Sequence, residues 1–210
     1  MLNTRQCNLI FDFDGTLVDS FNTVMQKFNL LAEDFKFRKI DEIEIEDIKN
    51  MTSNELIKYL KIPLLKLPKV MQKAREIMRN EIPNLAAFEN LPEVLDELYN
   101  SSCALGIVTS NSLDNVVSWL QNNKIDHLFD FIHSESSYFG KKQSLKKIIR
   151  KHRMEPSQTF YIGDETRDVE AALKSGIGSI AVSWGFNSLK ALASFKPDFI
   201  ANKPEDLLII

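Results

Sequence analysis

"CNLIFDFDGTLVDS" (residues 7–20) begins as an apolar run and passes into polar residues that include Asp12 and Asp14. Residues 7–13 have the composition of a buried β-strand. In an extended strand, residues i and i+2 point to the same face, so the two carboxylates begin side by side and repel unless a cation or a proton intervenes. A strand-ending turn followed by a helix cap also suits Asp, Gly, Thr and Ser. This segment alone leaves both interpretations open.

Four more short apolar runs follow, at residues 103–110, 129–132, 159–164 and 178–184. Most of them are continuously hydrophobic, which is typical of parallel strands covered on both faces. Helical patterns precede or follow the later runs, at residues 91–100, 113–123, 144–152 and 168–176. Strands that alternate with helices predict an α/β fold, with a doubly wound, Rossmann-like parallel sheet.

Residues 19–82 differ from the rest, because they contain several helical patterns and no convincing strand. The pattern of residues 20–35 places its apolar side chains on one helical face, and residues 53–60 and 67–80 give two further helices. We therefore expect an all-helical module of residues 17–83, inserted after the first strand. The α/β core would then comprise residues 1–16 and 84–210.

The composition is that of an ordinary soluble protein, with 44% hydrophobic and 26% charged residues among 210. A formal charge of −3 gives no electrostatic reason to expect nucleic acid as a partner. No apolar stretch is long enough to span a membrane, and no signal segment is evident, so we expect a cytoplasmic protein. The basic stretch 141–153 is interpreted as the solvated face of a helix. Cys7 and Cys103 are expected to be reduced, buried thiols.

Polar side chains follow three of the predicted strands. Asp12 ends the first, Thr109 and Ser110 end the second, and Asp164 ends the fourth. Open parallel sheets bind ligands just beyond the carboxyl ends of their strands, so these groups are expected at one edge. Asp168 would lie one helical turn beyond Asp164.

With Asp12 and Asp14, these acids would form a cluster of four carboxylates. Such a cluster is costly without a cation, and Mg²⁺ is the ion that fits best.

These motifs resemble those of a known family. "DFDGTLVDS" (12–20), "GIVTSN" (106–111), a lysine before a helix and "GDETRD" (163–168) occur in the order found in the haloacid dehalogenase-like phosphohydrolases. The whole chain resembles the phosphoglycolate-phosphatase-like branch, in which a helical cap is inserted after the first strand. A receiver domain also combines Asp, Thr and Lys with Mg²⁺, but its acceptor aspartate comes from a middle strand.

The resemblance implies a role for each matching residue. Asp12 would be the nucleophile that forms an aspartyl-phosphate. Asp14 would be the general acid for the leaving oxygen and then the base that activates water. The Thr109 hydroxyl and the Ser110 backbone N–H would donate to the phosphoryl oxygens.

The resemblance also implies a metal site and a catalytic lysine. Asp164 would hold Mg²⁺ together with Asp12 and the main-chain carbonyl of Asp14. Asp168 would be a ligand through water or a hydrogen-bond acceptor behind the ligands, although an ordinary acid at a helix start explains it nearly as well. Many relatives have Lys-Pro where this chain reads "GKKQS". We favour Lys141 over Lys142, as the group that neutralises the nucleophile and the phosphoryl charge.

The sequence thus predicts a Mg²⁺-dependent phosphatase acting on a small phosphorylated metabolite, with a cap that closes over the site. A phosphomutase of the same family would use the same two aspartates and remains an alternative. So does a catalytically silent metal-binding interaction module, although every chemical residue is retained. The substrate and the oligomeric state, monomer or dimer, stay open.

Overall fold

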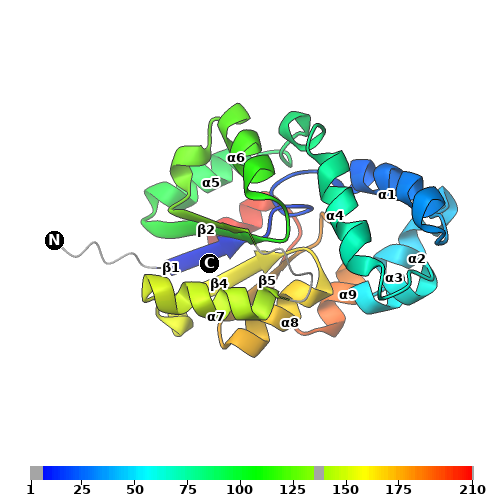
Figure 1. Ribbon diagram of the computed structural model, residues 1–210. Coiled ribbons are helices and arrows are strands. Elements are labelled where there is room, and N and C mark those ends of the chain that lie inside the picture. Colours follow the sequence, from blue (N-terminus) through cyan, green and yellow to red (C-terminus); the bar gives the residue numbers. More distant parts are fainter. Residues whose placement is uncertain (1–6, 135–139, 210) are drawn as a thin grey trace.

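A six-stranded parallel sheet forms the centre of the computed structural model, which describes residues 7–134 and 140–209 (Figure 1). The strands are β1 (Cys7–Phe11), β2 (Cys103–Thr109), β3 (Phe131–Ser134), β4 (Thr159–Gly163), β5 (Gly178–Val182) and β6 (Phe199–Ala201). Their order is β3-β2-β1-β4-β5-β6, so the chain winds to one side of β1 and then to the other. This topology confirms the doubly wound α/β prediction. The short strand β6 was not predicted.

Helices cover both faces of the sheet, so the β1 side chains that point to either face are buried. Leu9 and Phe11 belong to one apolar cluster, with side chains of α5 (Leu91–Asn100) and α6 (Leu113–Asn122). Ile10, between them, belongs to a second cluster, with side chains of α7 (Lys141–His152) and α8 (Thr166–Ser175). Alternate residues of a strand point to opposite faces, which explains why the run is hydrophobic throughout. Helix α9 (Leu189–Ser194) follows β5.

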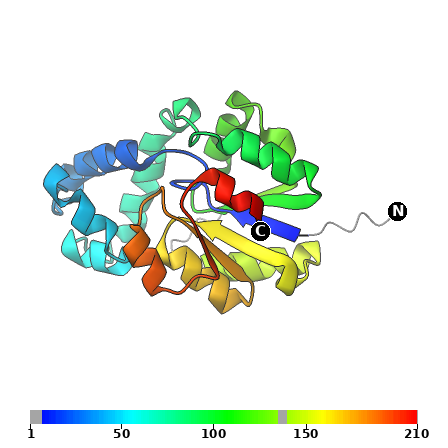
Figure 2. The ribbon, with the colours of Figure 1, turned by 180° about the vertical axis from the view of Figure 1, so that it is seen from behind.

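The remaining helices lie beyond the carboxyl ends of the strands, as Figures 1 and 2 show from opposite sides. They are α1 (Phe21–Phe35), α2 (Ile45–Lys49), α3 (Ser53–Tyr59) and α4 (Leu67–Met78). Three of them were predicted, and α2 was not. They enclose an apolar cluster of their own, which includes Leu31, Leu60 and Val70. This separate cluster supports a helical cap, while its predicted limits, residues 17–83, stay a prediction.

The two connections between the helical segment and the sheet run side by side. Val18, on the way in, forms an isolated bridge with Ala87, on the way out. The Asp19 N–H donates to the Ala86 carbonyl oxygen at 3.0 Å. The helical segment therefore leaves and rejoins the sheet at one place.

The expectation of reduced cysteines is wrong for this structure, in which Cys7 and Cys103 form a disulfide. The strand register explains the pairing. Cys7 and Cys103 are direct partners at the start of β1 and β2, and their Cα atoms lie 4.9 Å apart, within the range of disulfide geometry. The two cysteines lie 96 positions apart in the chain, so no local sequence pattern indicates this contact.

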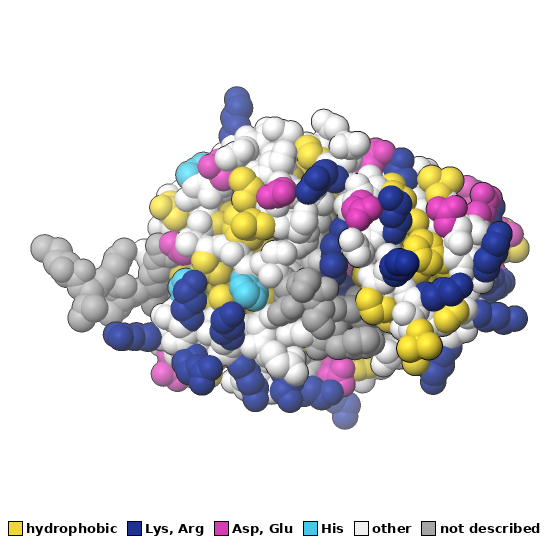
Figure 3. Space-filling model, viewed as in Figure 1, with side chains coloured by type: hydrophobic (Ala, Val, Ile, Leu, Met, Phe, Trp, Pro, Cys, Tyr) yellow, Lys and Arg dark blue, Asp and Glu magenta, His cyan; other side chains and the backbone are white. Residues whose placement is uncertain are grey.

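Two further sequence expectations concern the surface. The basic stretch 141–153 forms α7 and the turn after it, and its exposed side chains include Lys146, Lys147 and Arg150. Figure 3 shows Lys and Arg side chains along this edge of the molecule. The stretch is therefore the solvated helix face that was predicted. Within the described residues, no helix combines the length and the apolar character needed to cross a membrane.

Candidate active site

Polar side chains from separate elements meet at the carboxyl edge of the sheet, below the helical cap. Asp12 directly follows β1, Thr109 is the last residue of β2, and Asp164 directly follows β4. Lys141 is the first residue of α7, and Asp168 lies in the first turn of α8. Because parallel strands all end at the same edge, the fold alone brings these residues together.

Three buried carboxylates form the acidic cluster of this site. Oxygen atoms of Asp12, Asp164 and Asp168 all lie within 4.8 Å of one another, and no more than 3% of each residue is exposed. The sequence predicted four converging carboxylates, and the structure corrects this, because the Asp14 side chain lies outside the group. Strand β1 ends at Phe11, before either acid, so the strand rule does not hold their side chains parallel.

Lys141 lies between two of these acids. Its Nζ donates to Asp12 Oδ2 at 2.7 Å and to Asp168 Oδ1 at 2.5 Å. Burial alone would lower the pKa of Lys141, but the charges of Asp12 and Asp168 together raise it well above its usual value. The structure buries Lys141 and leaves Lys142 partly exposed, while the catalytic role of Lys141 stays a prediction.

Asp164 is completely buried and is held by neighbouring loops. Its Oδ1 accepts a hydrogen bond from Thr16 Oγ1, and its Oδ2 accepts one from the Phe186 backbone N–H, both at 2.7 Å. Gly15 lies so close that an added Cβ would stand 2.2 Å from Asp164 Oδ2, and its φ of +74° also favours glycine. Burial, followed by the charge of Asp168, raises the pKa of Asp164 well above its ordinary value.

Asp14 has a different environment from the three clustered acids. Its Oδ2 accepts a hydrogen bond from Asn111 Nδ2 at 2.8 Å, and its Oδ1 has no hydrogen-bond partner among the described residues. The Asn111 amide is itself held by Asn115, whose Nδ2 donates to Asn111 Oδ1 at 2.8 Å. Burial raises the pKa of Asp14 to about 6, and the bond from Asn111 partly opposes this shift. Asp14 can therefore exchange a proton near neutral pH.

Thr109 and Ser110 take the expected place at the end of β2. Thr109 is buried, and its Oγ1 accepts a hydrogen bond from the Asn111 backbone N–H at 3.0 Å. Ser110 is partly exposed and lines the cavity described below. Both residues stand beside the acidic cluster without belonging to it. Their proposed contacts with a phosphoryl group remain predictions.

Asp168 combines the two interpretations that the sequence left open. Its Oδ2 accepts from the Glu165 backbone N–H at 3.0 Å, which is the contact of a helix-capping acid. Its Oδ1 contacts Lys141 on the side of the acidic cluster. Burial raises the pKa of Asp168 to about 6, and the charge of Lys141 acts in the opposite direction. One side chain thus starts a helix and orients the lysine.

Sequence reasoning missed the residues that connect the cap to the site. Asn187 Nδ2 donates to the backbone carbonyls of Lys49 and Met51, at 3.0 and 2.9 Å, while its Oδ1 accepts from the Thr166 N–H at 2.8 Å. Ser53 Oγ donates to Glu165 Oε2 at 3.1 Å. The contacts of Asn187 and Glu165 with the cap join positions more than a hundred residues apart, and no local pattern indicates them.

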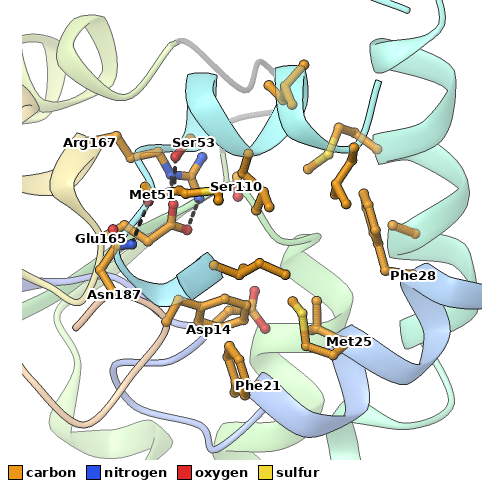
Figure 4. Close-up of a pocket in the computed structure, with 18 of the residues that line it drawn as sticks. Asp14, Phe21, Met25, Phe28, Met51, Ser53, Ser110, Glu165, Arg167 and Asn187 are labelled. Carbon is orange, nitrogen blue, oxygen red and sulfur yellow. Dashed lines mark hydrogen bonds and ion pairs between the residues drawn. The ribbon is translucent and has the colours of Figure 1, made fainter. Parts of the chain in front are cut away.

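A cavity of about 190 Å³ lies between the cap and the acidic cluster. Asp12, Asp14 and Ser110 belong to its floor, and side chains of α1, α3 and α4 form its walls. Figure 4 shows Phe21, Met25 and Phe28 on one side of Asp14. Arg167, Glu165 and Asn187 lie on the other side.

Arg167 lies within the motif "GDETRD" (163–168), and its sequence position alone predicted no role. It pairs with Glu165 on the cavity wall through two contacts of 2.7 Å.

The donor set fits a hard divalent cation. Three buried carboxylates face the single ammonium of Lys141, so the described residues leave net negative charge in a dry place. Carboxylate oxygens are the ligands that Mg²⁺ prefers, and an uncompensated buried charge is unfavourable. Asp12, Asp164 and Asp168 are therefore the residues that can hold such an ion.

Comparison with known proteins agrees with this arrangement. Residues 9–182 match the family model described as haloacid dehalogenase-like hydrolase. The chain is 34% identical over 200 residues to a phosphoglycolate phosphatase of Synechococcus elongatus, covering 95% of this chain and 94% of that protein. It is 25% identical to the pyrophosphatase PpaX of Bacillus mycoides, over 96% and 95% of the two chains.

A solved structure gives the same result. A haloacid dehalogenase-like family hydrolase from Streptococcus pneumoniae superposes with a TM-score of 0.79 and 26% identity, over 98% of each chain. The matches of sequence and fold extend over nearly the whole chain. The chain belongs to the haloacid dehalogenase-like hydrolase family.

Proposed function

We propose that this protein is a Mg²⁺-dependent phosphatase that hydrolyses a small phosphorylated metabolite through a phosphoryl group on Asp12. The contact between the buried Asp12 carboxylate and Lys141, beside a second carboxyl group whose pKa is about 6, carries this proposal. One aspartate is in contact with an ammonium, and the other is poised to exchange a proton. The family and the phosphatase names of the relatives support the same reaction.

The first half of the reaction transfers the phosphoryl group. An oxygen of Asp12 attacks phosphorus, and the bond from phosphorus to the ester oxygen breaks. The departing oxygen takes the proton of Asp14, whose raised pKa keeps that proton available near neutral pH. In this proposal Thr109, Ser110 and Lys141 donate hydrogen bonds to the phosphoryl oxygens, and the hydrogen bond from Asn111 fixes the direction of the Asp14 carboxyl group.

The second half releases phosphate. Asp14, now ionised, takes a proton from a water molecule, whose oxygen attacks phosphorus and displaces Asp12. Inorganic phosphate leaves, and both aspartates return to their starting states. When bound by Asp12, Asp164 and Asp168, with the Asp14 main-chain carbonyl as a further ligand, Mg²⁺ would supply positive charge that offsets the charge of the phosphoryl group.

Intact-mass measurement of two variants tests the assignment. Asp12→Asn and Asp14→Asn are each mixed with acetyl phosphate and Mg²⁺, because an acyl phosphate has a good leaving group and needs little help from a general acid. We expect a phosphate adduct on Asp14→Asn, which keeps the nucleophile but lacks the base that removes the phosphoryl group. We expect none on Asp12→Asn. An adduct on Asp12→Asn would contradict the nucleophile assignment.

The fate of the phosphoryl group distinguishes the alternatives. Release of inorganic phosphate into water supports the phosphatase, whereas transfer to an added sugar phosphate without release would identify a phosphomutase. A wild-type protein that binds Mg²⁺ but turns over no phosphate ester would be the silent module. Each result excludes the other two.

A further inference from the structure

The cavity above the acidic cluster is lined mainly by apolar side chains of the cap. Met25 and Phe28 come from α1, Leu56 from α3, and Leu67 and Met71 from α4. The cavity is continuous with the reaction site, because Asp12 and Asp14 line it as well. The part of a substrate that lies beyond the phosphoryl group would therefore be surrounded by hydrocarbon and thioether groups.

Methionine has an unusual share of this lining. Four of the six methionines in the chain, Met25, Met51, Met71 and Met78, contribute to it. Methionine side chains are flexible and polarizable, so they adapt to apolar groups of different shape. Such a wall suits a hydrocarbon group better than a carboxylate, which needs fixed donors.

The cations that line the cavity are already engaged. Arg167 makes two contacts of 2.7 Å with Glu165, and Arg75 of α4 also has an interaction within the protein. A second anionic group on the substrate would enter a mainly apolar space in which both lining cations have other partners. Burying an ionised group under these conditions is unfavourable.

The size of the cavity limits the occupant. Ligand sites for drug-sized molecules have volumes of about 300–1,000 Å³, and an apolar cavity of about 150 Å³ in another protein holds one benzene ring. The cavity here, about 190 Å³, includes the space beside Asp12 and Asp14, so it is suited to a phosphoryl group with a small leaving group.

From these observations we propose that the preferred substrate is a phosphate monoester whose leaving group is apolar, a short alkyl chain or a single aromatic ring that lies in the cap cavity. The proposal rests on the phosphatase function above and adds the class of leaving group. It predicts that a second negative charge near the ester weakens the substrate, even though one relative is named a phosphoglycolate phosphatase and another a pyrophosphatase.

A matched series of esters tests the proposal. We compare kcat/KM for ethyl, propyl and butyl phosphate, whose leaving groups have nearly equal acidity, and expect an increase of about fourfold per methylene. Isobutyl phosphate and phosphoglycolate have the same number of heavy atoms, with an isopropyl group in place of a carboxylate. We expect isobutyl phosphate to be the better substrate. A flat series, or a preference for phosphoglycolate, would overturn the proposal.

Two variants on α1 locate the effect in the cavity. Met25→Lys places an ammonium in the lining and should lower kcat/KM for butyl phosphate by about tenfold or more, while improving phosphoglycolate. Leu30→Lys, on the same helix but 58% exposed and outside the cavity, should leave both values unchanged. Equal effects of the two variants would contradict the proposed location.

Acetyl phosphate distinguishes the phosphatase proposal from the leaving-group proposal, since its small acyl group does not need the cavity. If acetyl phosphate is hydrolysed but kcat/KM is the same for ethyl, propyl and butyl phosphate, only the leaving-group proposal is overturned. Failure to hydrolyse acetyl phosphate as well would overturn the phosphatase function, and the leaving-group proposal with it. The thermal midpoint of each variant shows whether it has folded.

Discussion

Lys141 is the residue on which the electrostatics of the site depend. Its ammonium contacts Asp12 and Asp168, which follow different strands, and it lies 5.3 Å from the centre of the Tyr161 ring. A charge held in this way needs no reorganisation when a phosphoryl group arrives. The same contacts tie α7 to the ends of β1 and β4, so Lys141 serves both the geometry and the charge of the site.

Replacing the two adjacent lysines separately tests this role. Lys141→Ala removes the ammonium that faces the nucleophile, and we expect kcat to fall on the order of 10²-fold or more. Lys142→Ala, at the partly exposed neighbouring position, should change kcat by less than about threefold, as an exposed charge does. Steady-state kinetics with one phosphate ester measures both values. The reverse pattern would move the assignment by one residue.

Residues that carry a motif could be predicted individually, but their partners could not. Asp12, Asp164 and Lys141 were found because each stands at a strand end or helix start within a short pattern. Asn111 was visible in the sequence as part of "GIVTSN", yet its hydrogen bond to Asp14 depends on a loop conformation that no spacing rule provides. The prediction that the Asp14 carboxylate joins the acidic cluster failed for a related reason. It assumed that residues 12 and 14 point to the same face of a strand, but β1 ends at Phe11.

At the level of elements, the loop between β5 and α9 connects the cap with the acidic cluster. The Phe186 N–H of this loop holds Asp164, and the next residue, Asn187, donates to two carbonyls at the end of α2. The Ser188 N–H also donates to the Lys49 carbonyl at 2.8 Å. One short loop therefore fixes both an acid of the site and the position of the cap.

Removing the Asn187 amide should loosen the cap selectively. Asn187→Ala loses three hydrogen bonds, each worth about 1 kcal/mol. Hydrogen exchange followed by mass spectrometry should show faster exchange in residues 45–59 and unchanged exchange in the sheet. Asn100→Ala, whose exposed side chain donates to Asp96 within α5, is the control. Faster exchange throughout the chain would indicate general destabilisation instead.

The elements themselves were largely predictable where their patterns were strong. Strands β1, β2, β4 and β5 and helices α1, α3 and α4 lie within predicted segments, because buried strands and amphipathic helices have distinct periodicities. Strand β3 (Phe131–Ser134) only overlaps the predicted run 129–132 and extends two residues beyond it. Helix α2 has five residues and β6 has three, too few for a period to be recognised. The contacts between loop and cap could not be predicted, since they depend on how two separate units dock.

For the molecule as a whole, the acidic cluster links metal, protons and stability. The pKa of Asp168 is raised to about 6 and that of Asp164 is raised well above normal, in both cases chiefly by burial. The folded metal-free protein therefore binds more protons than the unfolded chain at mildly acidic pH. Its free energy of unfolding consequently decreases as the pH rises through about 6.

Mg²⁺ should reverse this loss of stability. Ligand carboxylates must be ionised to bind a metal, so added Mg²⁺ should raise the thermal midpoint more at pH 8 than at pH 5. EDTA should remove both this gain and the activity. Differential scanning fluorimetry measures the shift, with Asp168→Asn as the variant that should respond less and Glu170→Gln, on the exposed side of α8, as its control. Full activity after exhaustive chelation would contradict the metal site.

The disulfide between Cys7 and Cys103 makes the segment from 8 to 102, cap included, a closed covalent ring. A protease that cuts once in the cap, for example in the loop with the exposed Leu64 and Leu65, opens the ring without releasing a fragment. Such a nicked protein should migrate as one species on a non-reducing gel and as two after reduction. If the two pieces separate without reductant, the cysteines are not joined in solution. A joined pair permits the cap to be cleaved while both ends of the break remain attached to the sheet.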